Sequence, residues 1–428
     1  MGVPCPLPCI SKNETDISDH QSNSNSNFHS DTASNSSLYS QPSLPSVPSL
    51  TPPSQHVEQP SNTYHHVLAN LKGHSSYVFS LALAGKHLYS CSSNGEIRIW
   101  SRDQPTDEYY STINSTNLVA QGNSAIKSVV ILGDKLFTAH QDHKIRVWKI
   151  DNHDDPTHLK KYKRIATLPT LNDRCVRVLS AKNYVKVRRH KKSTWVHHID
   201  AVSALALSKD CSLLYSVSWD RTFKIWRTSD FKCLESVWNA HEDAINAIVL
   251  SHDGLFIYTG SADKKIKVWR KQDQGDKKHT SLVATLEKHK SAVNALALST
   301  DGTVLYSGAC DRSIVVWEKN SSCGQHMVVV GALRGHTKAI LCLTVVSDLV
   351  CSGSADKTVR IWKRDGVGKS YCCLAVLEGH RGPVKCLTAT ADNNHARDNS
   401  SSDGISYKVY SGSLDCDIKV WKIWVPFV

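Results

Sequence analysis

Short apolar runs separated by polar turns make up most of the chain. Val202–Leu207 and Val293–Leu298 are apolar runs too short for a helix and suited to buried strands. A second apolar run then leads into an acidic turn, as in Leu213–Asp220, and an alternating run such as Lys265–Trp269 follows. A fourth, more variable run completes the unit. The pattern predicts repeating units of four short strands from Tyr64 onward.

A constant spacing marks the end of each unit. Seven times, an acidic or amide residue stands six positions before a tryptophan, although the units differ in length. These pairs are Asn94/Trp100, Asp142/Trp148, Asp220/Trp226, Asp263/Trp269, Asp311/Trp317, Asp356/Trp362 and Asp415/Trp421. A fixed offset in unequal units indicates a repeat array, and seven units of four strands predict an all-β, seven-bladed β-propeller. The repeat cores are expected at residues 72–100, 120–148, 196–226, 239–269, 287–317, 334–362 and 378–421.

Residues 1–63 have a different composition from the rest of the chain. They contain fifteen Ser, nine of the fourteen Pro and few hydrophobic residues, so they bury too little apolar surface to offset the entropy of ordering. We therefore expect a disordered tail at residues 1–63 and a propeller at residues 64–428. Prolines at every third position over residues 42–48 suit polyproline II, and Thr51, which precedes a proline, is a candidate phosphorylation site. A plain spacer is the alternative.

The circle of blades must also close. Tyr64–Leu71 precedes the first unit, and we expect it to form the outer strand of the last blade, beside Ile418–Trp421. Closure of this kind removes the exposed strand edges that otherwise promote aggregation.

Five units carry a complete set of His, hydroxyl, Asp and Trp residues. The sets are His198/Ser216/Asp220/Trp226, His241/Thr259/Asp263/Trp269, His289/Ser307/Asp311/Trp317, His336/Ser352/Asp356/Trp362 and His380/Ser411/Asp415/Trp421. Asp, His and Ser together resemble a hydrolase triad. The fivefold recurrence, the exchange of Ser for Thr and the terminal indole N–H instead favour a buried hydrogen-bond chain without catalysis. In two units the set is incomplete, because Asn94 stands in place of Asp and Gly122 in place of His, and we expect the second blade to be the least protected.

These motifs resemble the WD-repeat family over residues 64–424. The resemblance rests on the pairs Gly73-His74, Gly335-His336 and Gly379-His380 and on the phrases Ser352–Trp362 and Ser411–Trp421. None of the seven tryptophans is followed by Asp, which departs from the family pattern. The resemblance implies that the polar sets pin the strands of a blade together and that the protein binds other proteins.

The stretch Asn183–Ala206 looks like the basic insert of plant WD-repeat proteins related to Jingubang. This similarity implies a non-enzymatic plant adaptor in cytoplasm and nucleus, with protein partners such as transcription regulators. A substrate receptor of a cullin-type ubiquitin ligase is the alternative. Receptors of that class often carry Trp-Asp-x-Arg at the motif tryptophan, and none of the seven motifs here does.

Family geometry also implies which residues face a partner. The residues three and five positions after the His, and the one before the Asp, point out of the face that carries these turns, which we call the top face. The larger ones are Tyr77, Phe79, Lys127, Gln141, Trp219, Asn246, Asn294, Leu341, Lys385 and Leu414. Trp219 is the strongest candidate because the polar sets do not use it, and large aromatic residues dominate binding hot spots. Partial burial of Trp219 under a loop is the alternative.

The longest connection between units, Pro169–His197, is strongly basic and leads into a His turn on the top side. Its bases over residues 181–198 are Lys182, Lys186, Arg188, Arg189, Lys191 and Lys192. No acid occurs over residues 181–198, so we expect a composite site for an acidic peptide over the second and third blades. A solvated loop, or a nuclear import signal at Arg188–Lys192, would explain the same charge.

Charge and composition narrow the partners. The formal net charge is +12, and this excess of bases favours acidic partners such as protein tails, nucleic acid or an anionic membrane, with solubility alone as the alternative. The bases expected on the opposite face lack interleaved aromatic residues, so specific nucleic-acid binding is not expected. No apolar run is long enough to span a membrane, and no Cys or His spacing suits zinc, so neither a span nor a metal or other cofactor is expected. We expect a monomeric propeller.

Overall fold

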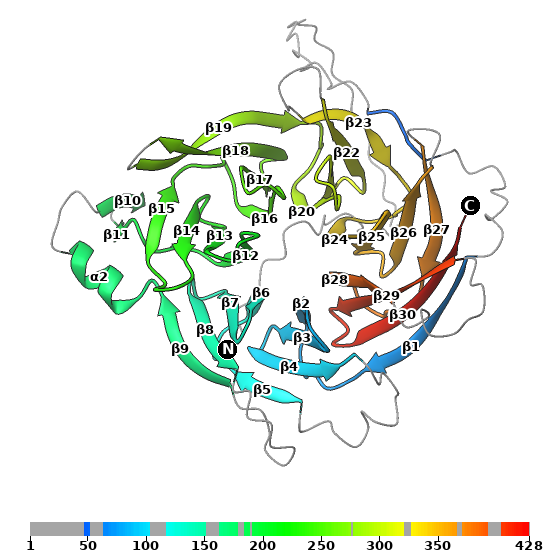
Figure 1. Cartoon of the computed structure of the whole chain (residues 1–428), viewed down its shortest axis with the longest axis horizontal. Helices are drawn as coiled ribbons and strands as arrows, with labels where there is room; N and C mark the ends of the chain where they lie inside the picture. Colours follow the sequence, from blue (N-terminus) through cyan, green and yellow to red (C-terminus); the bar gives the residue numbers. More distant parts are fainter. Residues whose placement is uncertain are drawn as a thin grey trace, which may run out of the picture. The chain divides into compact units, whose positions relative to one another are not determined.

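The computed structural model describes residues 47–51, 63–102, 117–150, 162–178, 184–188, 191–274, 277–320, 327–365, 370–392 and 404–427. Residues 47–428 belong to one compact unit, and its sheets form a seven-bladed propeller (Figure 1). Each blade is a four-stranded antiparallel sheet, so the predicted fold class is confirmed. The tail expected at residues 1–46 and 52–62 lies outside the described residues. Within the described part, no helix is both long and apolar enough to cross a membrane.

The blades follow one another along the chain. Blade 1 is β2 (Val78–Ala84), β3 (His87–Ser92), β4 (Glu96–Ser101) and β5 (Leu118–Gln121); blade 2 is β6 (Ile126–Leu132), β7 (Lys135–His140), β8 (Ile145–Ile150) and β9 (Tyr162–Leu168). Blade 3 is β12 (Val202–Leu207), β13 (Leu213–Ser218), β14 (Phe223–Arg227) and β15 (Cys233–Val237); blade 4 is β16 (Ile245–Leu250), β17 (Phe256–Ser261), β18 (Lys265–Gln274) and β19 (Lys277–Glu287). Blade 5 is β20 (Val293–Leu298), β21 (Val304–Ala309), β22 (Ile314–Lys319) and β23 (Met327–Leu333); blade 6 is β24 (Ile340–Val346), β25 (Leu349–Ser354), β26 (Val359–Arg364) and β27 (Tyr371–Leu377). Blade 7 is β28 (Val384–Ala391), β29 (Gly404–Ser413), β30 (Ile418–Pro426) and β1 (Tyr64–Leu71).

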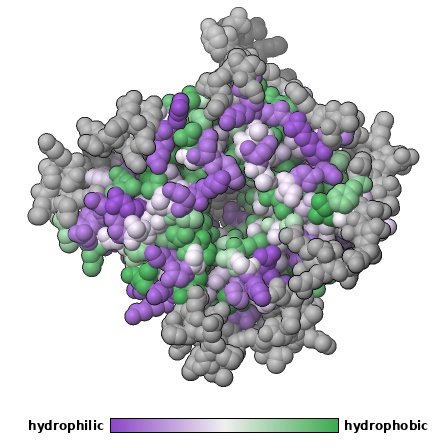
Figure 2. All heavy atoms as spheres, in the orientation of Figure 1, coloured by the Kyte–Doolittle hydropathy of each residue, from purple (hydrophilic) through white to green (hydrophobic). Residues whose placement is uncertain are grey.

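The first strands of neighbouring blades contact one another and line the centre, where the face seen in Figure 2 is hollowed. The second strand of a blade is buried at nearly every position, as in β17 and β21, because neighbouring blades cover both of its faces. Burial on both faces explains why the sequence shows continuous apolar runs there instead of alternation.

Strand β1 closes the circle from the other end of the chain. It pairs antiparallel with β30, with Val67 opposite Trp421 and Leu71 opposite Ile418. The expected closing strand is therefore confirmed, and blade 7 joins the beginning and the end of the propeller in one sheet (Figure 1).

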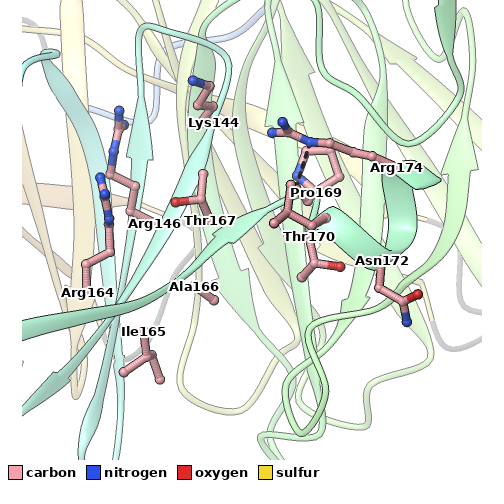
Figure 3. Close-up of a pocket in the computed structure, with 11 residues that line it drawn as sticks. Lys144, Arg146, Arg164, Ile165, Ala166, Thr167, Pro169, Thr170, Asn172 and Arg174 are labelled. Carbon is pink, nitrogen blue, oxygen red and sulfur yellow. Dashed lines mark hydrogen bonds between the residues drawn. The ribbon is translucent and has the colours of Figure 1, made fainter.

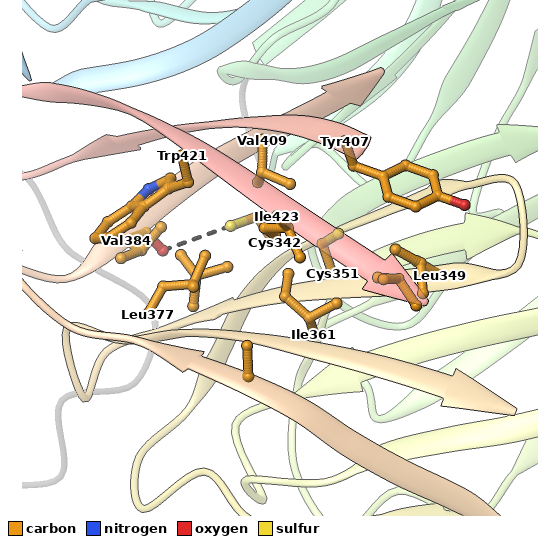
Figure 4. Packing of buried hydrophobic residues seen from close by; sticks show 13 residues of the cluster. Cys342, Leu349, Cys351, Ile361, Leu377, Val384, Tyr407, Val409, Trp421 and Ile423 are labelled. Carbon is orange, nitrogen blue, oxygen red and sulfur yellow. Dashed lines mark hydrogen bonds between the residues drawn. The ribbon is translucent and has the colours of Figure 1, made fainter. Parts of the chain in front are cut away.

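The hydrophobic core lies between blades. Figure 4 shows the cluster between blades 6 and 7, where Leu349, Cys351 and Ile361 pack with Val409 and Trp421. All five are buried, and burial raises the pKa of the Cys351 thiol to about 12. This thiol therefore acts as a small hydrophobic side chain, as expected for a cysteine in an apolar strand.

The connection from Pro169 to His197, expected as a loop, contains regular structure. It forms α2 (Leu171–Val178) and a hairpin of β10 (Tyr184–Arg188) and β11 (Lys191–Thr194) outside the circle (Figure 1). The Asp173 N–H donates to Thr170 Oγ1 at 3.2 Å, which caps the helix. The buried Asp173 carboxylate accepts the Cys233 N–H at 3.0 Å and so attaches α2 to blade 3. On blade 4, the β18–β19 hairpin likewise extends well beyond the blade core, with pairing that continues to Gln274 and Lys277.

The tail boundary at residue 63 needs a correction. Val47–Thr51 belongs to the compact unit and lies against β23, where Ser49 forms a parallel bridge with Ala332. Overall composition predicts disorder over a long window, whereas a few backbone hydrogen bonds and two apolar side chains suffice to hold five residues.

Candidate functional site

In blades 3 to 7 each polar set forms one continuous hydrogen-bond chain. In blade 3, His198 Nδ1 lies 3.0 Å from Asp220 Oδ2, and His198 Nε2 lies 2.8 Å from Ser216 Oγ. The Trp226 indole N–H donates to the same Ser216 oxygen at 2.9 Å. The other four blades repeat the arrangement with His–Asp distances of 2.8–2.9 Å. Each chain thus connects a His turn, the second strand and the third strand of its blade.

Thr259 and Ser307 are the central hydroxyls of the chains in blades 4 and 5. His241 Nε2 lies 2.8 Å from Thr259 Oγ1, and His289 Nε2 lies 2.7 Å from Ser307 Oγ. The Trp317 indole N–H donates to Ser307 Oγ at 2.9 Å, and an indole N–H donates to Thr259 Oγ1 in the same way. A threonine therefore serves as well as a serine at this position, as the structural interpretation requires.

Burial places these residues inside the blades, where the interpretation as a buried hydrogen-bond chain expects them. Thr259 and Ser307 are 0% exposed and Trp317 is 2% exposed, so none of the three lines a surface that a partner or substrate could reach. The other hydroxyls and indoles of blades 4 to 7 are likewise buried, namely Trp269, Ser352, Trp362, Ser411 and Trp421. These sets hold strands together inside the blades, and a binding site must be sought elsewhere.

The protonation states fit a structural network. Burial lowers the pKa of His198 despite the neighbouring carboxylate. Burial raises the pKa of Asp220, but the hydrogen bonds from His198 and Thr222 and the positive charge of Lys224 act against it, and the Asp220 pKa lies well below its usual range. A neutral imidazole donates to Asp220 and accepts from Ser216. The Ser216 oxygen is fully buried and already accepts the indole N–H, so no substrate reaches it.

Blade 1 completes its network with a residue that the sequence pattern missed. His74 Nδ1 lies 3.2 Å from Glu96 Oε2, two positions beyond Asn94, and His74 Nε2 lies 2.7 Å from Ser90 Oγ. The hydrogen bond from His74 is the largest cause that holds the Glu96 pKa well below its usual range. Arg98 Nε also donates to Glu96 at 3.1 Å. The polar set of blade 1, expected to be incomplete because of Asn94, is therefore completed by the Glu96 carboxylate.

Blade 2 uses a different histidine. His140 on β7 lies with Nε2 2.8 Å from Thr138 Oγ1, and its Nδ1–H donates to the Ser124 carbonyl at 3.2 Å. The Trp148 indole N–H donates to Thr138 at 2.9 Å. Residue 122 is glycine where blades 3 to 7 have the histidine that binds the acid. Asp142 instead accepts two hydrogen bonds from Arg146. Blade 2 is therefore rearranged, and its carboxylate is engaged by the buried Arg146.

Four of the expected top-face residues meet across blades 1 to 3. Lys127 Nζ lies 4.3 Å from the centroid of the Phe79 ring and 5.4 Å from that of the Trp219 ring. The rings of Tyr77 and Phe79 are 6.5 Å apart, and Tyr77 is 49% exposed. Phe79 is buried and supports the other three. We call these four residues the aromatic–lysine cluster, in which a cation stands between aromatic faces.

The other expected top-face residues do not join this cluster. Asn246 Nδ2 donates to the Val293 carbonyl at 3.0 Å, and Asn294 Nδ2 donates to the Ile340 carbonyl at 2.8 Å, so both hold neighbouring blades together. Gln141 is half-buried in the β7–β8 turn, and Leu341, Lys385 and Leu414 are half-buried on blades 6 and 7. The side chains of the insert bases lie outside the described residues; only the backbone of Lys186, Arg188, Lys191 and Lys192 is placed, in the β10–β11 hairpin.

A basic pocket lies between blade 2 and α2, and the sequence analysis missed it. Its volume is about 640 Å³, and four cations line it, namely Lys144, Arg146, Arg164 and Arg174. Figure 3 shows Arg146 and Arg164 pointing the same way from β8 and β9, with the guanidinium of Arg174 directed back from α2. Arg174 Nε donates to the Pro169 carbonyl at 3.1 Å, which fixes its direction. We call this site the basic pocket.

Within the described residues, no group of three or more His, Cys, Asp or Glu side chains is placed to hold a metal ion.

Strand register explains why the sequence alone did not reveal the basic pocket. Its bases come from β8, β9 and α2, and only the pairing of Arg146 with Thr167 and of Trp148 with Arg164 brings them to one wall.

Comparison with known proteins agrees with this architecture. The family description "WD domain, G-beta repeat" matches residues 65–101, 189–227, 231–270, 280–318, 327–363 and 371–422. None of these segments covers residues 126–168 of blade 2, where the polar network is rearranged.

Curated relatives match over short stretches. The chain is 39% identical over 69 residues to "Pre-mRNA-processing factor 19 homolog 2" of Arabidopsis thaliana, covering 16% of this chain and 13% of the relative. It is 31% identical over 93 residues to "Cell division control protein 4" of Candida albicans, covering 22% and 11%. It is 24% identical over 172 residues to "Ribosome biogenesis protein YTM1" of Eremothecium gossypii, covering 38% of each. The alignments thus span well under half of these relatives. The repeat matches cover more than half of the chain, and the chain belongs to the WD40 repeat family.

Proposed function

We propose that this protein is a non-enzymatic interaction scaffold that binds an acidic segment of a partner protein over blades 1 to 3. The basic pocket is the observation that carries the proposal. Four cations line this pocket. Among the described residues, the one carboxylate that is hydrogen-bonded to any of them is that of Asp142, which accepts from Arg146. A concave wall with excess positive charge attracts carboxylates and orients them by charge-assisted hydrogen bonds.

The rim of the basic pocket favours a segment that mixes acidic and apolar residues. Ile165 is 42% exposed and Leu171 is 77% exposed, and both line the pocket beside the cations. An acidic segment with interspersed aliphatic side chains satisfies both features. The aromatic–lysine cluster offers a second contact on the top face, where Trp219 supplies an aromatic anchor.

A plant regulatory role is the finer form of this proposal. It is supported by the likeness of the insert Asn183–Ala206 to that of Jingubang-related proteins. Segments that alternate acidic and hydrophobic residues are also typical of transcriptional activation domains. We place the protein in cytoplasm and nucleus, with Arg188–Lys192 as the candidate import signal.

Charge reversal of the pocket tests the proposal. The double variant Lys144→Glu, Arg164→Glu reverses the charge of two bases that line the pocket. Within the described part of the chain, no side-chain hydrogen bond gives either base a structural role. The probe is a labelled ten-residue peptide of alternating Glu and Leu, and a Gln–Leu peptide serves as its neutral counterpart. We expect the variant to bind the acidic peptide at least tenfold more weakly by fluorescence polarisation, with the wild-type preference for Glu over Gln lost.

A matched control separates the pocket from overall charge. Lys209→Glu with Lys357→Glu alters two exposed bases on blades 3 and 6 and shifts the net charge equally. Equal weakening by both double variants, or no weakening by the pocket variant, would overturn the proposed site.

A further inference from the structure

A short segment of the N-terminal tail lies on the outer edge of blades 5 and 6. The Leu50 N–H donates to the Ala332 carbonyl at 2.9 Å, and the Ala332 N–H donates to the Pro48 carbonyl at 2.9 Å. The Tyr371 N–H, at the start of β27, donates to the Leu50 carbonyl at 2.9 Å. The segment Val47–Thr51, drawn in blue in Figure 1, therefore bridges the outer strands of two blades. We call it the strap.

The strap fits a hollow in β23. A Cβ atom added to Gly331 would lie 2.4 Å from Leu50 Cγ, so only glycine leaves room for this leucine. Leu50 packs against the core cluster between blades 5 and 6, and Val47 against that between blades 4 and 5. Arg334 Nη2 donates to the Val47 carbonyl at 3.0 Å. Main-chain pairing and one side-chain hollow together define a strand-addition site.

Thr51 fastens the far end of the strap through its hydroxyl. Thr51 Oγ1 donates to the Arg334 carbonyl at 3.3 Å and lies 3.0 Å from Ser49 Oγ. The Ser49 hydroxyl in turn donates to the Thr51 carbonyl at 3.0 Å. Proline follows Thr51 in the sequence, which is the context that proline-directed kinases require.

We propose that Thr51 is a phosphorylation site and that its phosphorylation detaches the strap from blades 5 and 6. A kinase transfers the γ-phosphoryl group of ATP to Thr51 Oγ1. A new P–O bond forms, the bond to ADP breaks, and the hydroxyl proton passes to the base of the kinase.

The phosphate removes what holds this end of the strap. The esterified oxygen has no hydrogen to donate to the Arg334 carbonyl, and the new negative charge lies beside that carbonyl oxygen. The Arg334 guanidinium, which would neutralise it, is bound at the Val47 carbonyl near the opposite end. Detachment frees the amides of Ala332 and Tyr371 and opens the hollow over Gly331.

Amide hydrogen exchange on the full chain tests the proposal, because the Ala332 and Tyr371 amides donate directly to the strap. The protein is treated with a proline-directed kinase and ATP, and phosphate on Thr51 is quantified by mass spectrometry. We expect exchange at Ala332 and Tyr371 to become at least tenfold faster after phosphorylation, while the buried reference Ile340 on β24 is unchanged. Thr51→Ala treated in the same way should show no phosphate-dependent change.

Two further variants define the detached state. Gly331→Ala should speed exchange at the same two amides without phosphate, because its methyl group displaces Leu50. Leu44→Ala changes the equivalent residue of an upstream Pro-Ser-Leu copy and should leave both amides as in the wild type. Absence of phosphate on Thr51, or unchanged or slower exchange at Ala332 and Tyr371 once phosphate is present, would overturn the proposal. Slower exchange would mean that Arg334 turns to the phosphate and tightens the strap.

Discussion

Gly122 and His140 share one site in blade 2: a Cβ atom on Gly122 would lie 3.7 Å from His140 Cε1. The imidazole of His140 reaches Thr138 from β7, whereas in blades 3 to 7 the imidazole comes from the turn before the first strand. The missing side chain at residue 122 and the additional histidine at residue 140 are thus parts of one exchange.

This exchange predicts a coupling between the two positions. Gly122→His alone should lower the free energy of unfolding by about 1–3 kcal/mol, because a second imidazole overfills the site. In a His140→Ser background, which introduces the residue found at this position in blades 1, 3, 4, 6 and 7, the same change should cost less. Urea unfolding of the four proteins in the cycle measures the coupling, and additive effects would contradict the shared site.

The same histidine predicts part of the pH dependence of stability. Burial, followed by the charge of Arg146, lowers the pKa of His140 to about 3, from 6.5 for the unfolded side chain. Between these values the unfolded chain binds a proton that the folded chain does not, so stability falls as pH is lowered from 6.5 toward 3. Each pKa unit corresponds to roughly 1.4 kcal/mol. Urea midpoints at pH 7, 6, 5 and 4 should show a shallower decline for His140→Gln than for the wild type.

An exposed histidine provides the control for that measurement. His252→Gln removes an exposed imidazole from the β16–β17 turn and should leave the slope as it is in the wild type. If both variants flatten the profile equally, His140 is not its source.

In blade 1, we expect a second substitution to restore part of the stability that a first one removes. Glu96→Gln leaves the buried His74 and Arg98 side chains without their carboxylate and should cost about 2–4 kcal/mol of unfolding free energy. Asn94→Asp in that background places a carboxylate at the position used in blades 3 to 7 and should restore part of the loss. Chemical denaturation of the single and double variants measures this, and no recovery in the double variant would mean that residue 94 does not reach His74.

The sequence predicts those parts of the molecule that depend on local patterns. The offset to each tryptophan and the apolar runs fix the blade count, and the Tyr64–Leu71 strand follows from the need to close the circle. The sequence pattern missed Glu96 and His140 because each takes the role of a residue that the pattern expects at another position. Only the folded sheet brings their side chains to the polar network. The basic pocket and the strap likewise depend on register and on contacts between segments distant in sequence.

Trp219 provides the test of the top face. Its ring stands 5.4 Å from Lys127, and Lys127 also stacks on Phe79, so the cation holds the two aromatic groups in one surface. Removing an aromatic anchor from such a cluster typically costs about 2 kcal/mol of binding free energy, or roughly 30-fold in affinity. Proximity labelling in cells with Trp219→Ala should therefore lose the partners that the wild type captures.

Trp238→Ala is the matched control for Trp219→Ala. Trp238 also belongs to blade 3 and is half-buried, and it stacks with Lys224 at 4.7 Å instead of Lys127. Because Lys224 is almost fully buried and bonded to the Trp195 carbonyl at 2.6 Å, this second contact serves the blade itself. Partner capture should survive Trp238→Ala and fail with Trp219→Ala at equal protein levels, whereas equal loss in both would assign the effect to the stability of blade 3.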